Sequence, residues 1–163
     1  MLRLSKLTDY GTVMMSYMAR RPSGLHSATD IALGLGVTLP TASKILKRLA
    51  RAKLVQSVRG AHGGYRLSRS PEQISITDVF DALEGPFGMT ECSAVAGLCS
   101  QEAGCPIRGQ WQSLNQLIRH TLDRVTLADM SRPRYRPDAG SATLPLQRMP
   151  PRPRDTGVTG VGR

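Results

Sequence analysis

Three cysteines lie within one window of 14 residues, and their side chains are the most suited in this chain to inorganic chemistry. Cys92, Cys99 and Cys105 are the only cysteines present, and glycine, serine and proline occur among and beside them. Thiolates are preferred ligands of soft metals and of iron–sulfur clusters. Because the number of cysteines is odd, they cannot all pair in internal disulfides. The window therefore predicts a loop that binds a metal ion or an inorganic cluster.

Two other interpretations of the cysteines stay open. Structural zinc sites also combine three cysteines with one further ligand, but about two to four residues usually separate their neighbouring ligands. Here six residues separate the first pair and five separate the second, and cluster loops tolerate such wider gaps better. A thiol switch, in which two of the cysteines exchange a disulfide, needs no metal. The colour of the anaerobically purified protein distinguishes a cluster from both.

The chain lacks the signatures of common enzyme sites and of membrane segments. It contains neither a GxxxxGK phosphate-binding loop nor the paired histidines of a metalloprotease, so we do not expect an enzyme. No apolar run approaches the roughly 20 residues that span a bilayer, and the N-terminus lacks the apolar region of a secretory signal. We therefore expect a cytoplasmic protein without membrane contacts, in a compartment that keeps thiols reduced.

The distribution of charge indicates a polyanion as partner. The net charge of the chain is +10. Residues 1–70 hold 12 Lys and Arg against 2 acidic residues, residues 71–130 hold 3 against 8, and residues 131–163 hold 7 against 2. A basic head thus precedes an acidic middle and a basic tail. Such a head is the electrostatic footprint of a nucleic-acid-binding protein, and a merely solvated basic face is the alternative.

Helical periodicity places many of the basic residues on one helix. Apolar spacing predicts a first helix over 5–20, and a short helix that starts at Ser27 and stops at Gly34 and Gly36. Thr38–Pro40 then opens a helix with a buried stripe and a separate cationic face. A short helix, a glycine turn and a basic second helix are typical of a helix-turn-helix, whose second helix enters the major groove of DNA.

A glycine-rich hairpin is expected directly after this helix. Strands over 54–58 and 65–68 flank the segment Arg59–Gly64, whose glycines permit the positive φ angles of a hairpin tip. Because the hairpin follows a basic helix, we interpret it as a wing that brings Arg59 to the minor groove or to a phosphate, in preference to a plain hairpin. The predicted DNA-contacting residues are Pro40, Thr41, Ser43, Lys44, Lys47, Arg48, Arg51, Arg59, His62, Gly63 and Tyr65.

The rest of the chain divides into three segments. Residues 71–106 comprise a connecting helix that starts at Ser75 and the cysteine loop. Residues 107–130 carry a sustained apolar stripe and predict one long helix, which the small head cannot cover, so we expect it to pair with a second copy in a homodimer. Residues 131–163 contain 6 of the 11 prolines and predict a disordered basic tail.

The predicted fold class is mainly α with a small β-hairpin wing. A winged helix-turn-helix occupies residues 1–70, and a long C-terminal helix makes the dimer. These elements place the cysteine loop between the head and the dimerisation helix. We therefore expect a DNA-binding protein whose affinity depends on an inorganic cofactor.

Two stretches and the cysteine loop together resemble one family. Leu2–Tyr10 and Leu54–Tyr65, followed by three cysteines before a long helix, are similar to bacterial winged-helix regulators typified by the iron–sulfur regulator IscR and the nitric-oxide sensor NsrR. The opening and the wing most resemble the branch that regulates SUF-type iron–sulfur cluster assembly. The resemblance extends over about the first 130 residues.

The resemblance implies a cofactor and its ligands. Members are homodimers with a [2Fe–2S] or [4Fe–4S] cluster on three cysteines, which here would be Cys92, Cys99 and Cys105. IscR-like members add a histidine three residues after the last cysteine, where this chain has Arg108, which cannot ligate. NsrR-like members add an acidic residue from the first helix of the partner subunit, and Asp9 stands at the matching position. Asp9 is the leading fourth ligand, with an ordinary surface carboxylate as the alternative interpretation. The other candidate ligands are Glu91, Glu102, His62 and His120.

These features predict a transcriptional regulator, and more narrowly a repressor, that binds a double-stranded DNA operator and senses cluster status. By the resemblance it would control SUF-type genes by negative feedback, since the promoter would be released when clusters are scarce. The alternatives are a nitric-oxide or redox sensor of the same family, and a constitutive DNA binder with a structural zinc site.

Overall fold

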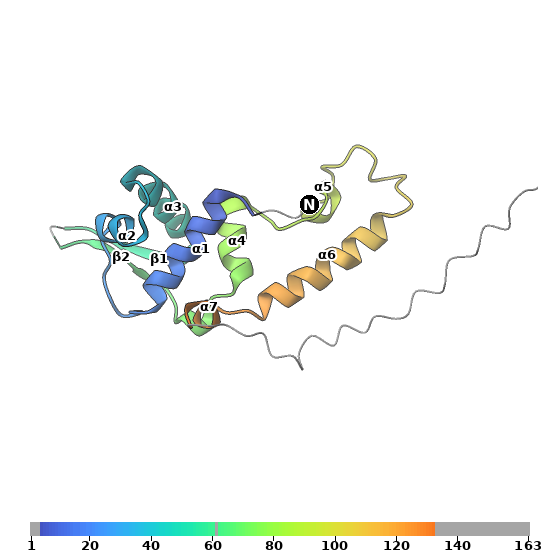
Figure 1. Ribbon diagram of the computed structural model, residues 1–163. Helices are drawn as coiled ribbons and strands as arrows, with labels where there is room; N and C mark the ends of the chain where they lie inside the picture. The colour runs from blue at the N-terminus through green and yellow to red at the C-terminus, as the bar shows by residue number, and fades with distance from the viewer. Residues whose placement is uncertain (1–3, 61, 133–163) are drawn as a thin grey trace, which may run out of the picture.

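Figure 1 shows a mainly helical fold with one small two-stranded sheet, which confirms the predicted winged fold. The computed structural model describes residues 4–60 and 62–132, so the tail predicted for 131–163 lies almost wholly outside the described residues. No helix in the described residues is long and apolar enough to cross a membrane. The elements are α1 (Lys6–Ala19), α2 (Ala28–Leu35), α3 (Leu39–Arg51), β1 (Val55–Val58), β2 (Gly64–Leu67), the 3-10 turn η1 (Pro71–Gln73), α4 (Ile76–Glu84), α5 (Glu91–Ala94), α6 (Arg108–Asp123) and α7 (Leu127–Ser131).

Hydroxyl side chains begin the first four α-helices. The Ser5 hydroxyl accepts a hydrogen bond from a backbone N–H in the first turn of α1, and Ser27 and Thr38 do the same for α2 and α3. At α4, Ser75 and Asp78 form a reciprocal capping box. Such caps satisfy backbone donors that have no partner within the helix. The helix starts predicted from sequence at Ser27, Thr38 and Ser75 are therefore found.

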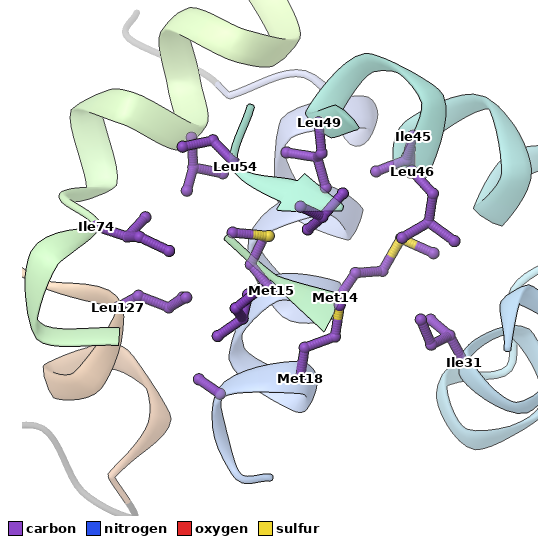
Figure 2. Close-up of a cluster of buried hydrophobic side chains, with 14 of the residues drawn as sticks. Met14, Met15, Met18, Ile31, Ile45, Leu46, Leu49, Leu54, Ile74 and Leu127 are labelled. Carbon is purple, nitrogen blue, oxygen red and sulfur yellow. The ribbon is translucent and has the colours of Figure 1, made fainter. Parts of the chain in front are cut away.

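The core of the head forms around α1. Met14, Met15 and Met18 are fully buried and, as Figure 2 shows, lie among the aliphatic side chains of several other elements. The labelled neighbours are Ile31, Ile45, Leu46, Leu49, Leu54, Ile74 and Leu127. Methionine is unbranched and adapts to irregular gaps between such side chains. Because α1 contacts α2, α3, α4, α7 and β2, it is the element against which the others are placed.

The predicted wing is an antiparallel hairpin that is tied to the rest of the head. In the register of β1 and β2, Val58 lies opposite Gly64. The backbone N–H of His26 donates to the Tyr65 carbonyl at 2.9 Å, and the His26 carbonyl accepts from the Tyr65 N–H at 2.8 Å. These two bonds hold β2 on the side that faces away from β1. A β-carbon at position 64 would lie 2.6 Å from the His26 carbonyl oxygen, so this close approach requires glycine. The strands of the hairpin, α2 and α3 lie at one end of the molecule (Figure 1).

The single helix predicted over 107–130 is instead two helices, and that prediction was wrong. α6 ends at Asp123, and α7 starts after its N-cap residue Thr126. Leu127 is fully buried in the core, and its N–H donates to the carbonyl of Ile74 at 2.8 Å. Burial of this leucine and the new backbone bond replace the contacts that a continuous helix would have made. Because of this break, α7 packs against α1.

We predict that Leu127→Ala lowers the free energy of unfolding by about 2–5 kcal/mol, because the truncated side chain leaves a cavity in the core beside α1. Urea denaturation monitored by circular dichroism measures this change. Leu33→Ala is the matched control, since Leu33 is 78% exposed, and it should change the value by less than about 0.5 kcal/mol. Equal effects of the two substitutions would show that α7 does not dock as described.

Candidate nucleic-acid interface and cysteine loop

Helix α3 presents a polar face away from the core. Ala42, Ile45, Leu46 and Leu49 are buried, as the predicted stripe requires. On the opposite side Pro40, Lys44, Lys47 and Arg51 are exposed, and Thr41 and Ser43 at their edges are half-buried. Neither Lys44 nor Lys47 makes an ion pair within the described residues. The face can therefore offer its charges to an external anion.

Arg48 differs from the other cations of α3. Arg48 is half-buried, and its Nη1 donates a hydrogen bond to the Leu83 carbonyl oxygen of α4 at 2.5 Å. The structure thus places this predicted DNA-contacting residue at the seam between α3 and α4, beside the exposed face.

The wing supplies further polar groups at the same end of the molecule. Arg59 and His62 are exposed, whereas Gly63 and Tyr65 are half-buried. Gly60 has a φ of 126°, which is the positive-φ geometry expected at the tip. The exposed α3 residues and the wing lie at the end opposite the cysteine loop and α6 (Figure 1). The basic residues of α3 and the wing thus lie apart from the cysteine loop, although the acidic helix α4 packs against α3.

Cys92 is held by a buried amide. It lies in α5, a one-turn helix within the segment predicted as irregular loop, and it is 8% exposed. Its Sγ lies 3.3 Å from the Thr90 hydroxyl. Asn115 of α6 is 6% exposed, accepts from the Met89 N–H at 3.2 Å and donates to the Ser93 carbonyl at 3.1 Å. Asn115 therefore fastens the backbone on both sides of Cys92 to α6.

The other two cysteines flank an ion pair. Cys99 and Cys105 are half-buried and, like Cys92, they are unpaired. Between them the Glu102 carboxylate accepts from the Gly97 N–H at 2.6 Å and pairs with Arg108 at 2.5 Å. This candidate ligand is thus engaged by a backbone donor and a guanidinium, and Arg108 serves as its counter-ion.

The donor types fit a soft metal or an iron–sulfur cluster, but a single protomer does not gather them. Within the described residues no three His, Cys, Asp or Glu side chains converge on one point. Asp9 is exposed and lines a hollow near the start of α1, together with Tyr10 and Glu84. Glu91 and His120 are exposed, and His62 is an exposed residue of the connection between β1 and β2. Ligation by three thiolates would require the segment 95–107, which has no regular structure, to close around the group.

The start of α1 is joined to the end of α4 by a carboxylate. Glu84 accepts hydrogen bonds from the hydroxyl groups of Ser5 and Thr8. These bonds and, to a smaller extent, the charge of Arg48 lower the pKa of the Glu84 carboxyl, so it is ionised at neutral pH. The hollow beside Asp9 is thus lined by two acidic side chains, Asp9 and Glu84, and by Lys6.

Sequence reasoning did not identify Asn115 or Glu84. Asn115 interrupts the apolar stripe of α6 between Leu114 and Ile118, and a polar residue on an otherwise apolar helix face is the signal that could have found it. Glu84 gives no such signal, because its partners lie 76 and 79 residues away in sequence.

The chain matches a known protein family over most of its length. Residues 4–133 match a family model described as Rrf2, iron-dependent transcriptional regulator. This range includes the head, the cysteine segment and the helices α6 and α7.

Several solved regulators have a similar fold. T. potens IscR is 32% identical, with a TM-score of 0.61 over 79% of this chain and 85% of its own. CymR (YrzC), the global cysteine regulator of B. subtilis, is 30% identical, with a TM-score of 0.62 over 80% of this chain and 97% of its own. The oxidized form of Staphylococcus aureus CymR is 28% identical, with a TM-score of 0.62 over 82% of this chain and 98% of its own.

We predict that Asn115→Ala exposes Cys92. The substitution leaves the Met89 N–H and the Ser93 carbonyl without their partner, which lowers the unfolding free energy by roughly 1–3 kcal/mol and releases the segment that carries the thiol. Alkylation of Cys92 by N-ethylmaleimide, followed by peptide mass spectrometry, should be faster in the variant. Gln116→Ala removes an exposed amide from the same helix and is the control. Equal alkylation rates in all three proteins would contradict the role of Asn115.

Proposed function

The chain belongs to the Rrf2 family of transcriptional regulators, and from this premise we propose that it is a cytoplasmic homodimeric repressor controlled by an iron–sulfur cluster. The observation that carries the proposal is the position of the cysteines. All three are unpaired and lie between α4, which contacts the candidate reading helix α3, and α6. A group bound there would act on the segment that joins the reading head to the rest of the protein.

DNA binding by α3 and the wing is supported by charge and exposure. The head carries the excess of Lys and Arg, and the exposed face of α3 is cationic. In the helix-turn-helix mode the N-terminal part of α3, with Pro40, Thr41 and Ser43, meets base edges. Lys44, Lys47, Arg51 and, on the wing, Arg59 and His62 bind phosphates. Gly63 and Tyr65 shape the wing.

Dimerisation through α6 is supported by its uncovered apolar side chains. Leu114 and Leu117 are 40% and 42% exposed, and Ile107 just before the helix is 52% exposed. The buried residue of α6 is polar Asn115, so its apolar stripe contributes no fully buried side chain in the protomer. A second copy paired through this stripe would bury it and present two reading heads to two half-sites of an operator.

Cys92, Cys99 and Cys105 would hold the cluster, with Asp9 of the partner subunit as the fourth ligand. When bound, an iron–sulfur cluster, either [2Fe–2S] or [4Fe–4S], supplies a redox-sensitive and oxidant-labile group. The ligand residues would determine how the loop is placed. The cysteines would draw segment 95–107 together. Asp9 of the partner subunit would connect this loop to helix α1 of that subunit, and within a protomer α1 contacts α3.

Regulation of SUF-type cluster assembly genes is the finer part of the proposal. It is supported by the likeness of the opening and wing sequences to that branch. Loss of the cluster would shift the spacing or tilt of the two heads, which is a change of population and not a new contact with DNA. Release of the promoter when clusters are scarce would give negative feedback.

Thiol oxidation is the second candidate mechanism. It is favoured by the three free thiols and by the similarity to CymR, including a form described as oxidized. Nitric oxide acting on a cluster, and a structural zinc ion in a constitutive DNA binder, are the remaining alternatives.

We expect the anaerobically purified protein to be coloured, with broad absorption between about 320 and 460 nm and matching iron and sulfide contents. Cys99→Ser should abolish the colour, and Asp9→Ala should weaken or shift it. Ser100→Ala is the control, because Ser100 is next to Cys99 in sequence but is not one of the proposed ligands. A colourless protein with stoichiometric zinc would refute the sensor. A colourless, metal-free protein that reconstitution with iron and sulfide does not colour would favour the thiol switch.

Lys44→Gln should weaken binding to a fluorescent duplex that is selected from a random-sequence library. If Lys44 contacts a phosphate, the slope of log K against log salt should fall in magnitude by about 1, because one fewer counterion is released. Fluorescence anisotropy at several salt concentrations measures this slope. Glu72→Gln, on the exposed turn η1, should leave it unchanged. An unaltered slope for Lys44→Gln would count against α3 as the reading helix.

A further inference from the structure

The interactions of Arg48 set it apart from the phosphate-binding cations proposed for α3. Lys44, one turn earlier, is exposed, whereas Arg48 is half-buried and bonded to the Leu83 carbonyl. One donor of its guanidinium is held by a backbone acceptor within the protein, which fixes the group at the seam between α3 and α4 and not on the exposed face. The geometry therefore assigns the residue a different task.

The acceptor is the C-terminal end of α4. The last carbonyl groups of a helix lack intrahelical partners, and they carry the negative end of the helix dipole. Gly85, with a φ of 93°, ends α4, and Leu83 lies in the final turn. A cation placed there stabilises the end of the helix and joins it to α3.

A second polar contact continues from α4 to α1. Glu84, next to Leu83, accepts hydrogen bonds from the hydroxyls of Ser5 and Thr8, and its charge attracts Arg48. Asp9 follows Thr8 directly. The side chain of Arg48 and the carboxylate of Glu84 thus connect the reading helix with the part of α1 that carries the candidate fourth ligand.

The three helices are also in close contact below these polar groups. A β-carbon added at Gly11 of α1 would overlap the Leu83 side chain and would lie 3.5 Å from Ile45 of α3. Because close-packed side chains transmit displacement and do not absorb it, a shift of the end of α4 must move α3 or α1. α4 contacts both helices, and Figure 1 shows α1 between the ribbons of α3 and α4.

The end of α4 is equally close to the cysteine segment. The Phe87 N–H donates to the Asp81 carboxylate of α4 at 3.0 Å, and the Phe87 carbonyl accepts from Asn115 at 3.4 Å. Asp81 also pairs with Arg119 of α6 at 2.5 Å. Only the short connection after Gly85 separates the Arg48 contact from the segment that Asn115 fastens around Cys92.

We propose that Arg48 is a positioning residue, which sets the angle of the reading helix α3 against the end of α4 and thereby connects DNA binding to the cysteine segment. This inference rests on the proposed DNA binding by α3. It states that Arg48 acts through the Leu83 carbonyl and Glu84 and contributes no phosphate contact. In contrast to Lys44, its removal should change affinity without changing the number of counterions released.

The test measures the affinity and the salt slope of Arg48→Gln for the library-selected duplex, beside wild type and Lys44→Gln. We expect Arg48→Gln to weaken binding roughly tenfold or more while keeping the wild-type slope, because a charge-assisted hydrogen bond is lost but no phosphate contact. Arg48→Lys, which keeps a donor and the charge, should recover part of the affinity with the same slope. A slope reduced as in Lys44→Gln, or an affinity equal to wild type, would overturn the proposal.

Glu84→Ala gives an independent result that does not depend on the folding of the Arg48 variants. Removing an acidic group should by charge alone strengthen DNA binding. If Glu84 helps to position α3, the substitution should instead weaken it, and circular dichroism should show that the variant is folded. Stronger binding by Glu84→Ala would overturn the proposal.

The two possible failures are distinguishable. Failure of the wild-type protein to bind any selected duplex would refute DNA binding itself. Wild-type binding together with a reduced salt slope for Arg48→Gln would refute only the role of Arg48.

Discussion

At Gly11 helix α1 lies so near α4 and α3 that a β-carbon would overlap Leu83 and touch Ile45. The fully buried methionines of α1 continue this contact along the helix, and α7 closes it from the other side. Helices α2, α3, α4 and α7 and strand β2 all contact α1, and α4 in turn contacts α6. The candidate reading helix α3 and the wing lie at one end, and α4 leads from the centre to the cysteine segment at the other (Figure 1). Because a close-packed interior transmits strain, a displacement of α4 is expected to reach α1 and α3.

Three polar contacts around this centre each join two neighbouring elements. Arg48 joins α3 to α4, Glu84 joins α4 to α1, and Asn115 joins the segment around Cys92 to α6. Each one satisfies backbone or hydroxyl groups that would otherwise lack a partner. A regulator needs both a reader and an element whose state changes. Asp81 of α4, which bonds to Phe87 and pairs with Arg119 of α6, completes the connection between these contacts. The resulting chain of contacts is the physical basis on which we propose coupling between the candidate reader and the candidate sensor.

Local chemistry made much of the fold predictable. Hydroxyl caps, a proline in the first turn of α3, the apolar period and the glycines of the wing each act over a few residues, so sequence alone reveals them. The break between α6 and α7 could not be predicted in this way. It depends on Leu127 meeting a core built from residues about 50 to 110 positions earlier in the chain. The bond between Arg48 and the Leu83 carbonyl could not be predicted for the same reason, since the two residues are 35 positions apart. The cysteine spacing predicted a ligand loop, but spacing cannot show how far the thiols lie apart in one protomer.

The central claim is that the state of the three cysteines controls the affinity of the distant head for DNA. The most direct measurement is the Kd of one preparation for one selected duplex, at fixed salt, before and after anaerobic loading with iron and sulfide. The account predicts a difference of at least about fivefold, the lower end of the range typical for coupling between two sites. Equal Kd values for protein whose loading is verified by iron and sulfide analysis would contradict it, and the chain would then bind DNA constitutively.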